Sequence, residues 1–328
     1  MRMFGGSLLV LVAGAPLQAQ QVADSAFRYP IARPAYEVGT GPAVCIDAGH
    51  HNFHTMDGRY LAFANLLRDD GYRVRSHEDE FSERTLMECR VVVIANAAGA
   101  ANAEDWAYPH PSAFTKQEIS ALLDWLRGGG SMLLIADHSP WPGAASDLAV
   151  LVGIQMFDGY VGTTVFGQLE DAAVRQTAEL YGISVEELRN AYAALGELGS
   201  HVILRGRDAG EVVPSVVTFT GQAFHPAFGV EPLLILGADA QGRVPFTLNS
   251  PGDSVGAAPS RFPLAGWLQG AALHVAEGRV VVLGEAATCT AQLAGPQRFP
   301  MGMSAPLARH NAQFCLNAVR WLAGVLNE

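Results

Sequence analysis

The sequence is poor in charged residues, in basic residues and in long apolar runs, and each shortage excludes a class of protein. Charged residues make up 16% of the 328 residues and hydrophobic residues 49%, so the chain is too apolar to be intrinsically disordered. The 21 Lys and Arg are outnumbered by 32 Asp and Glu, which argues against a nucleic-acid or anionic-lipid partner. No apolar stretch approaches the roughly 20 residues that span a bilayer, so we expect no stable membrane insertion.

Cysteine is also scarce, and its spacing matches no known metal or redox motif. The four cysteines are Cys45, Cys89, Cys289 and Cys315. Because no two of them form a C-x-x-C pair, neither a zinc knuckle nor a thioredoxin-like motif is present. We therefore expect free, buried cysteines that act as small apolar residues. The alternative is one disulfide, but the spacing does not show which two cysteines would form it.

The beginning of the chain has the pattern of an export signal. Arg2 supplies a positive start, residues 8–13 form a short apolar core, and a small-residue cleavage site precedes Gln20. The alternative is that the apolar core is a buried N-terminal strand or helix. We expect a signal peptide over residues 1–19, a single domain over residues 20–328, and a periplasmic or secreted location.

The N-terminal half alternates apolar strands with amphipathic helices. Strands are expected at 43–47, 72–76, 90–95 and 132–136. A helix is expected at 58–69, and a second helix follows a capping box at Thr115 and Glu118 and ends at Gly128. Apolar strands separated by such helices are typical of a mostly parallel sheet with helices on both faces.

The C-terminal half adds further strands and a helical insertion to this α/β pattern. The insertion lies near residues 160–197 and carries a second capping box at Ser184 and Glu187. Further strands are expected at 213–220, 232–237, 266–275 and 279–283. A closing helix carries Phe314, Ala318, Trp321 and Val325 on one face.

One carboxylate and three imidazoles follow the first expected strand within eight positions. They are Asp47, His50, His51 and His54. These side chains are suitable ligands for zinc or another divalent metal, and a neutral imidazole also serves as a base. The alternative is that the first two histidines cap the entrance of the helix and the third is solvated. We predict that the four residues hold a divalent metal or orient the substrate.

Polar groups also follow the strands that end near residues 136 and 283. They are Asp137, His138 and Glu285. Ligands of open α/β sheets bind outside the carboxyl ends of the strands, so we predict that these groups act there as acid, base or ligand. The alternative is that the carboxylates cap turns and that His138 bonds a backbone carbonyl. Ser139 is a weaker candidate nucleophile, because Pro140 follows it and the sequence pattern does not identify a histidine or other base that would activate its hydroxyl.

Aromatic residues near the same edge suggest a binding surface for a small molecule or a carbohydrate. Trp106 and Tyr108 lie in the loop 96–112, and Trp141 follows the strand at 132–136. Such residues form a platform on which a ring-shaped ligand stacks. Packing against the domain explains them equally well.

Parts of the chain resemble class I glutamine amidotransferase-like domains. The resemblance is carried by residues 114–141 (ending in SMLLIADHSPW), by 278–292 (GRVVVLGEAATCTAQ) and by 310–324 (HNAQFCLNAVRWLAG), the last two being similar to uncharacterised exported bacterial members. The resemblance implies a flavodoxin-like sheet. The family places a nucleophilic cysteine after the strand that here precedes Asp137 and His138, and none of the four cysteines matches it.

The sequence therefore predicts an exported hydrolase with a His, Asp and Glu site, with or without a metal, and without the thiol mechanism of a glutaminase. A non-catalytic ligand-binding module, for example for carbohydrate, is the alternative. Measurable turnover or a stoichiometric metal would separate the two hypotheses.

Overall fold

A computed structural model describes residues 21–192, 195–225, 229–244 and 260–327 of the chain. The expected signal peptide lies outside these residues, so both it and the division into one domain stay predictions. Within the described ranges, no helix has the length and apolar character that crossing a membrane requires.

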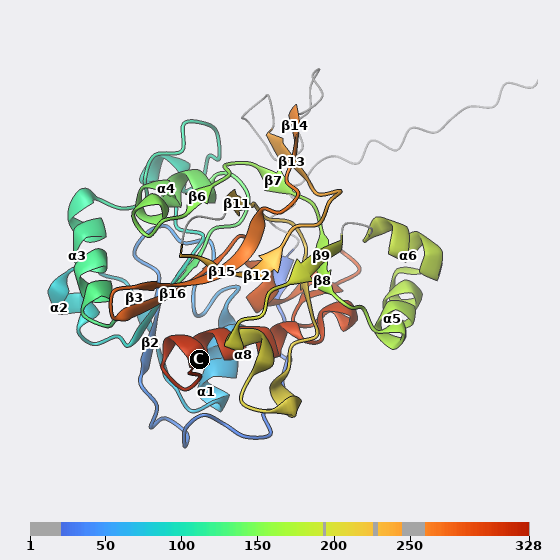
Figure 1. Ribbon diagram of the computed structural model, residues 1–328, viewed down its shortest axis with the longest axis horizontal. Coiled ribbons are helices and arrows are strands. Elements are labelled where there is room, and N and C mark those ends of the chain that lie inside the picture. The colour runs from blue at the N-terminus through green and yellow to red at the C-terminus, as the bar shows by residue number, and fades with distance from the viewer. Residues whose placement is uncertain (1–20, 193–194, 226–228, 245–259, 328) are drawn as a thin grey trace, which may run out of the picture.

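The centre of the molecule is a sheet whose first half is parallel (Figure 1). Five strands lie side by side in the order β3 (Arg73–His77), β2 (Ala43–Asp47), β4 (Val91–Ala95), β5 (Ser131–Ile135) and β16 (Gly278–Leu283). Every residue of β2, β4 and β5 is buried, as expected for apolar strands that are covered on both faces. Of these five parallel strands, β3 is the second along the chain and lies at the edge, while β2 is the first and lies inside it, which is the flavodoxin-like order.

The C-terminal half extends this sheet with mostly antiparallel strands. Beyond β16 follow β15 (Leu268–Val275), β12 (Glu231–Ile235), β9 (Leu195–Leu198), β8 (Thr164–Gly167) and β10 (Ser215–Thr218). The short strands β11 (Phe224–His225) and β6 (Gln155–Met156) pair beside β15. The expected α/β fold, parallel in its central part and enlarged by its C-terminal half, is confirmed.

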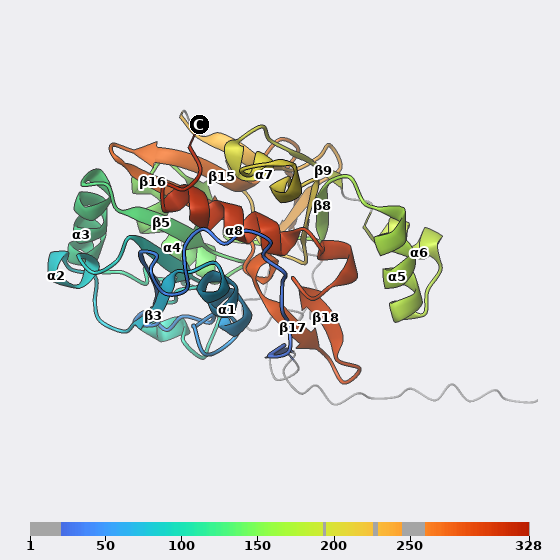
Figure 2. The ribbon, with the colours of Figure 1, turned by 90° about the horizontal axis from the view of Figure 1, so that it is seen from below.

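Helices cover both faces of the sheet, and we name the faces after them (Figure 2). The α8 face packs against α1 (Leu61–Asp69), α7 (Val202–Arg205) and α8 (Asn311–Leu322). The α3 face packs against α2 (Glu83–Leu86), α3 (Lys116–Arg127) and α4 (Trp141–Leu151). The capping box that predicts the start of α3 is confirmed, since Thr115 and Glu118 each satisfy the other's backbone N–H.

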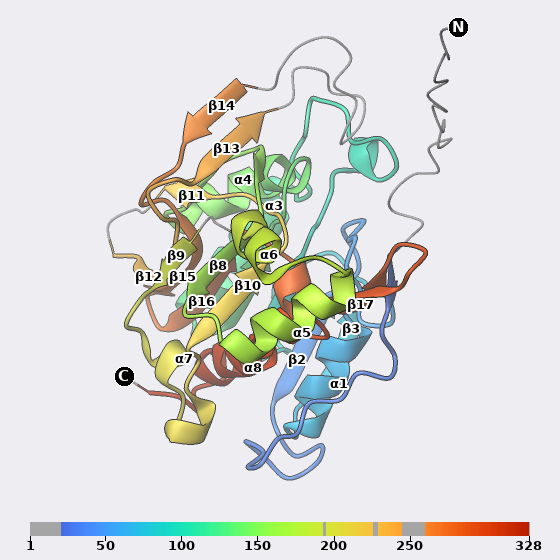
Figure 3. The same ribbon diagram turned by 90° about the vertical axis from the view of Figure 1, so that its right-hand side faces the viewer.

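The insertion contains two helices and also two strands of the main sheet. Helices α5 (Asp171–Tyr181) and α6 (Val185–Ala191) come between β8 and β9 in the chain and stand at one side of the molecule in Figure 1, the side that faces the viewer in Figure 3. The capping box at Ser184 is confirmed. The strands around it were not predicted, because each has only four residues.

Two three-stranded sheets complete the described structure, and neither was predicted. One contains β1 (Gln21–Ala23), β17 (Ala291–Ala294) and β18 (Phe299–Gly302). The other contains β7 (Tyr160–Val161), β13 (Gln241–Val244) and β14 (Ser260–Pro263).

The cysteines are paired, so the expectation of free thiols is wrong. Cys45 on β2 is bonded to Cys89, which precedes the neighbouring strand β4, and Cys289 is bonded to Cys315 on α8. The partners are 44 and 26 residues apart, and only the folded sheet brings them together. Closing loops of this length stabilises the native state by restricting the unfolded chain.

A buried ion pair joins α1 to α8. The guanidinium of Arg320 donates through Nε and Nη2 to both oxygens of Asp70, at 2.8 and 2.6 Å. Arg320 is 1% exposed and Asp70 is fully buried. Asp70 also accepts from the backbone N–H of Ala35, and Arg320 is paired with Glu211 at 3.0 Å. Four separate segments of the chain therefore meet at one charge cluster.

We predict that Arg320→Met destabilises the protein by about 3–5 kcal/mol, because it leaves the Asp70 carboxylate buried without its partner. The measurement is the free energy of unfolding in urea. Arg127→Met is the matched control, since Arg127 pairs with Asp124 on the exposed surface of α3 and its loss costs about 0.5 kcal/mol or less. Equal effects of the two substitutions would contradict the prediction.

Candidate functional site

The register between β5 and β16 brings two carboxyl groups together. Ile135 lies opposite Leu283 in this parallel pair, and both belong to the core on the α8 face. Because side chains alternate along a strand, Asp137 and Glu285, two residues further on, emerge next to each other on the same side. Asp47 ends β2 towards the α3 face, where its partners lie. The strand ends therefore divide the predicted polar residues into separate groups.

The first group is a buried network of Asp47, His50 and Glu118. Nδ1 of His50 lies 2.8 Å from Asp47 Oδ1, and its Nε2 lies 2.7 Å from Glu118 Oε1 on α3. Burial of the ring opposes its charge, but the hydrogen bonds and charges of the two carboxylates outweigh burial and raise the pKa of His50. Both ring nitrogens are occupied, so His50 ties the loop after β2 to the start of α3.

The other two predicted metal ligands lie apart from this network. His51 is exposed and has a left-handed backbone, with φ of 47°. His54 is buried, and its Nδ1 lies 3.2 Å from the side-chain amide of Asn96. Burial, with smaller contributions from the charges of Arg59 and His138, lowers the pKa of His54 to about 3, so its ring is neutral.

The structure thus does not assemble the predicted metal-binding set of Asp47, His50, His51 and His54. Across the described ranges, no cluster of three or more His, Cys, Asp or Glu side chains has the arrangement of a metal site. The reason is local: two of the four residues bond each other and α3, one points to solvent, and one bonds Asn96.

Asp137 is a buried carboxyl group, 6% exposed, at the turn that follows β5. Its Oδ1 accepts from the backbone N–H of His138 at 2.8 Å, and its own N–H donates to Asn96 Oδ1 at 2.9 Å. Burial raises the pKa of Asp137, although the charge of His138 and hydrogen bonds from the Ala286 N–H and Asn96 oppose the increase.

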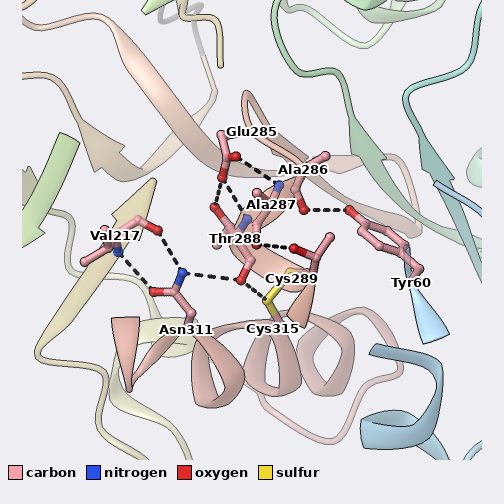
Figure 4. Close-up of a disulfide and its surroundings, with 10 residues drawn as sticks. Tyr60, Val217, Glu285, Ala286, Ala287, Thr288, Cys289, Asn311 and Cys315 are labelled. Carbon is pink, nitrogen blue, oxygen red and sulfur yellow. Dashed lines mark hydrogen bonds between the residues drawn. A yellow bond between two sulfur atoms is a disulfide. The ribbon is translucent and has the colours of Figure 1, made fainter. Parts of the chain in front are cut away.

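Glu285 caps the turn that follows β16, as the alternative interpretation of the sequence expected (Figure 4). Its carboxylate accepts from the backbone N–H of Ala287 at 2.9 Å and from the N–H and hydroxyl of Thr288 at 2.7 and 2.6 Å. Burial and then the charge of Asp137 raise the pKa of Glu285 well above its ordinary range. Two buried carboxyl groups that repel each other favour the state in which one proton is shared between them.

The same turn is fixed from the other side by α8. Thr288 O accepts from the amide of Asn311, and the neighbouring Cys289 is bonded to Cys315 (Figure 4). The hydroxyl of Tyr60, from the residue before α1, donates to Ala286 O at 3.2 Å. The turn that carries Glu285 therefore cannot move without disturbing the core.

His138 lies within a group of aromatic rings. Its ring stacks on Tyr160 with 4.5 Å between centroids, and it contacts Trp141 at 4.9 Å and Trp106 at 6.0 Å. The structure thus brings together three of the predicted residues, His138, Trp106 and Trp141. Phe53 completes the group by contacting both tryptophans.

Tyr108 and Ser139 belong to a neighbouring polar clamp centred on Asp158. This carboxylate accepts from Ser139 Oγ at 2.8 Å and bonds His110 Nδ1 at 2.7 Å, while its backbone carbonyl accepts from Tyr108 at 3.0 Å. His110 Nε2 bonds the Trp106 carbonyl. A serine nucleophile needs an imidazole beside it, but here a carboxylate takes that place, so the cluster fastens the loop 96–112 instead.

Asn96 is the site residue that sequence reasoning missed. It follows β4 directly, is fully buried and contacts both His54 and Asp137. The signal was available, because β4 is another parallel strand whose carboxyl end reaches the same edge of the sheet. Asp158 and Tyr160 had no such signal, since Asp158 lies in a bend after α4 and Tyr160 begins the two-residue strand β7, which is too short to show a pattern.

Comparison with known proteins supports the fold and assigns no function. No protein-family model matches the sequence, and no curated protein matches it. The N-terminal domain of mmIFT52 has a similar structure, with a TM-score of 0.50, 15% sequence identity and coverage of 85% of this chain and 96% of that one. At this identity the likeness shows the α/β fold alone.

Two bacterial proteins described as ThuA-like are also similar. The protein from Bacteroides uniformis has a TM-score of 0.45 and 13% identity, with coverage of 90% of this chain and 94% of that one. The protein from Parabacteroides merdae has a TM-score of 0.42 and 9% identity, with coverage of 87% and 90%.

Proposed function

We propose that the protein is an exported hydrolase for a small molecule, with His138 as general base and Asp137 as general acid. The observation that carries the proposal is the state of the His138 ring. Nδ1 lies 2.8 Å from the Ser139 carbonyl, which only accepts, so Nδ1 carries the proton and Nε2 has the free lone pair. Among the described residues nothing bonds Nε2, and this nitrogen is therefore available to take a proton from water.

Asp137 supplies the acid because its surroundings favour a protonated carboxyl group. Burial raises the pKa of both Asp137 and Glu285, so the pair favours holding a proton. Glu285 is bound to its turn by three hydrogen bonds, whereas Asp137 stands directly beside His138 and is the member that can pass the proton to a substrate. Two carboxyl groups whose environments differ in this way are typical of acid–base sites.

In the proposed reaction, Nε2 of His138 removes a proton from water, whose oxygen attacks the electrophilic atom of the substrate. Asp137 gives its proton to the departing group as the bond to that group breaks. The proton on His138 then returns to the Asp137 carboxylate through solvent, which restores both groups. Every step uses side chains of this chain, and no cysteine takes part, since the four cysteines are bonded in pairs.

The aromatic rings beside His138 support a ring-shaped substrate. Trp106 is partly exposed and lies edge to face with Trp141, at 4.8 Å between centroids. An aromatic face of this kind suits stacking of a sugar or another ring. The same observation favours the alternative function, a non-catalytic module that binds carbohydrate, in which His138 only donates or accepts a hydrogen bond.

Export is the second part of the proposal, and the disulfides support it. Two disulfides use all four cysteines of the chain. Structural disulfides persist in the periplasm or outside the cell and are rare in a reducing cytosol. This agrees with the export signal that the sequence predicts over residues 1–19.

We predict turnover of at least one member of a panel of p-nitrophenyl acetate and p-nitrophenyl hexosides. His138→Gln and Asp137→Asn should each lower kcat by roughly 100-fold or more, because each removes one proton-transfer group. Activity should decline as pH rises through the raised pKa of Asp137, because the acid then loses its proton. Release of p-nitrophenol measures all three effects.

His225→Gln is the control, since His225 is exposed on β11 and contacts Trp267 outside the aromatic group. It should leave the rate unchanged. If the panel shows no turnover and titration calorimetry detects a monosaccharide that His138→Gln no longer binds, the non-catalytic alternative replaces the hydrolase.

Export predicts a specific form of the protein from its native host. The chain should begin near Gln20 and contain no alkylatable thiol until it is unfolded and reduced, when four thiols appear. N-terminal sequencing and mass spectrometry after iodoacetamide treatment measure both properties. A chain that keeps Met1, or that is alkylated before reduction, would count against export.

A further inference from the structure

Asn96 connects three parts of the candidate site in an unusual backbone conformation. It lies directly after β4 with φ of 50°, in the left-handed region that asparagine tolerates better than most residues. Its backbone N–H donates to Ile135 O at 2.9 Å, and its carbonyl accepts from Phe53 N–H at 3.0 Å. The backbone of Asn96 is therefore fixed on both sides, and its side chain has little freedom.

The orientation of the Asn96 amide follows from its partners. The backbone N–H of Asp137 can only donate, so the atom that faces it at 2.9 Å is the carbonyl oxygen Oδ1. The amino group Nδ2 must then face His54, whose Nδ1 lies 3.2 Å away. No other orientation of the amide satisfies both contacts.

This orientation determines where His54 carries its proton. Nδ2 of Asn96 donates, so Nδ1 of His54 has to accept and cannot hold a hydrogen. The single proton of the neutral ring is therefore on Nε2. A second proton on Nδ1 would face the hydrogens of Asn96 inside the protein, which leaves a buried donor without an acceptor.

Among the described residues no hydrogen bond to Nε2 of His54 is found, and this nitrogen is not one of the fully buried side-chain atoms that lack a partner, although the residue as a whole is only 4% exposed. A donor that the protein neither bonds nor buries completely is available to a ligand. The group belongs to the candidate site, because the charge of His138 acts on His54 and Asn96 links it to Asp137.

We propose that Asn96 holds His54 as a neutral Nε2–H donor, and that this group donates a hydrogen bond to the substrate oxygen on which negative charge develops. A fixed neutral donor stabilises that charge without giving up its proton. The inference rests on the proposed function for the identity of the substrate. It assigns His54 as a catalytic residue and Asn96 as the positioning residue that sets its tautomer.

The test is NMR of the full-length mature protein with ¹⁵N-labelled histidine. Long-range ¹⁵N–¹H correlations distinguish an Nε2–H ring from an Nδ1–H ring, and His54→Gln assigns the signal. We expect the Nε2–H form in the wild type. Acetamide, a neutral carbonyl compound, serves as the probe, and we expect a saturable shift of the His54 Nε2 signal as it is added.

Asn96→Asp changes the proton pattern with little change of shape. The new carboxylate only accepts, so it should move the single proton of the neutral His54 ring from Nε2 to Nδ1, which leaves Nε2 without a hydrogen and abolishes the response to acetamide. Asn65→Asp adds the same charge on α1, where Asn65 contacts Arg68, and should leave His54 as in the wild type. If Asn96→Asp does not fold, Asn96→Gly tolerates the same φ, and loss of the fixed tautomer is then the expected result.

The outcomes separate this inference from the proposed function. An Nδ1–H ring in the wild type, or an Nε2 signal that does not respond to acetamide, overturns the donor role of His54. An unchanged tautomer in the Asn96 variants overturns the positioning role of Asn96. If the expected tautomer and acetamide response are found but no panel compound is hydrolysed, the hydrolase proposal fails while the donor assignment stands.

Discussion

Two carboxyl groups buried next to each other at the ends of β5 and β16 are the constraint around which the site is built. Neighbouring buried charges of one sign are unstable unless they are neutralised or hydrogen-bonded. Here burial raises the pKa of both groups, which favours a neutral member of the pair, and hydrogen bonds support the charge that remains. Glu285 accepts from the turn at Ala287 and Thr288, and Asp137 accepts from the backbone of His138. The disulfide to α8 and the Tyr60 hydroxyl hold the turn that makes this possible. The two carboxyl groups keep these hydrogen bonds only if their turns stay in place, so the site has to be rigid.

The sheet also separates two kinds of polar group that lie close together in the sequence. On the α3 face, both ring nitrogens of His50 are bonded by Asp47 and Glu118, and these carboxylates accept further bonds from Asn52 and Thr115, so this network contributes stability. Around Asn96, His54 and His138, by contrast, the structure fixes one nitrogen of each ring and leaves the other unbonded among the described residues. A ring nitrogen that is held in position but makes no hydrogen bond within the protein can bond a ligand.

The sequence was sufficient for the central fold because that fold depends on local patterns. The strand at 43–47 and the capping boxes at Thr115 and Ser184 are encoded by neighbouring residues, and the structure has them where the patterns predict. The pairing of Cys289 with Cys315 depends on how α8 packs, and no local pattern contains it. The predicted metal set failed to assemble for a related reason. The four residues lie in one loop, but their order in the sequence does not show towards which face of the sheet each side chain points. Glu118, the partner of His50, lies on α3 and is distant in the sequence.

The place of β16 within the sheet has a consequence for how the protein folds. This strand lies between β5 and β15, yet it comes from the last quarter of the sequence, so the parallel half of the sheet stays incomplete until most of the chain has been made. Contacts between such distant segments make folding slow and leave an unpaired β5 edge exposed in the meantime. Completion of the parallel half therefore depends on a strand that lies far along the chain from its neighbour β5, so the site at the ends of β5 and β16 forms late in folding.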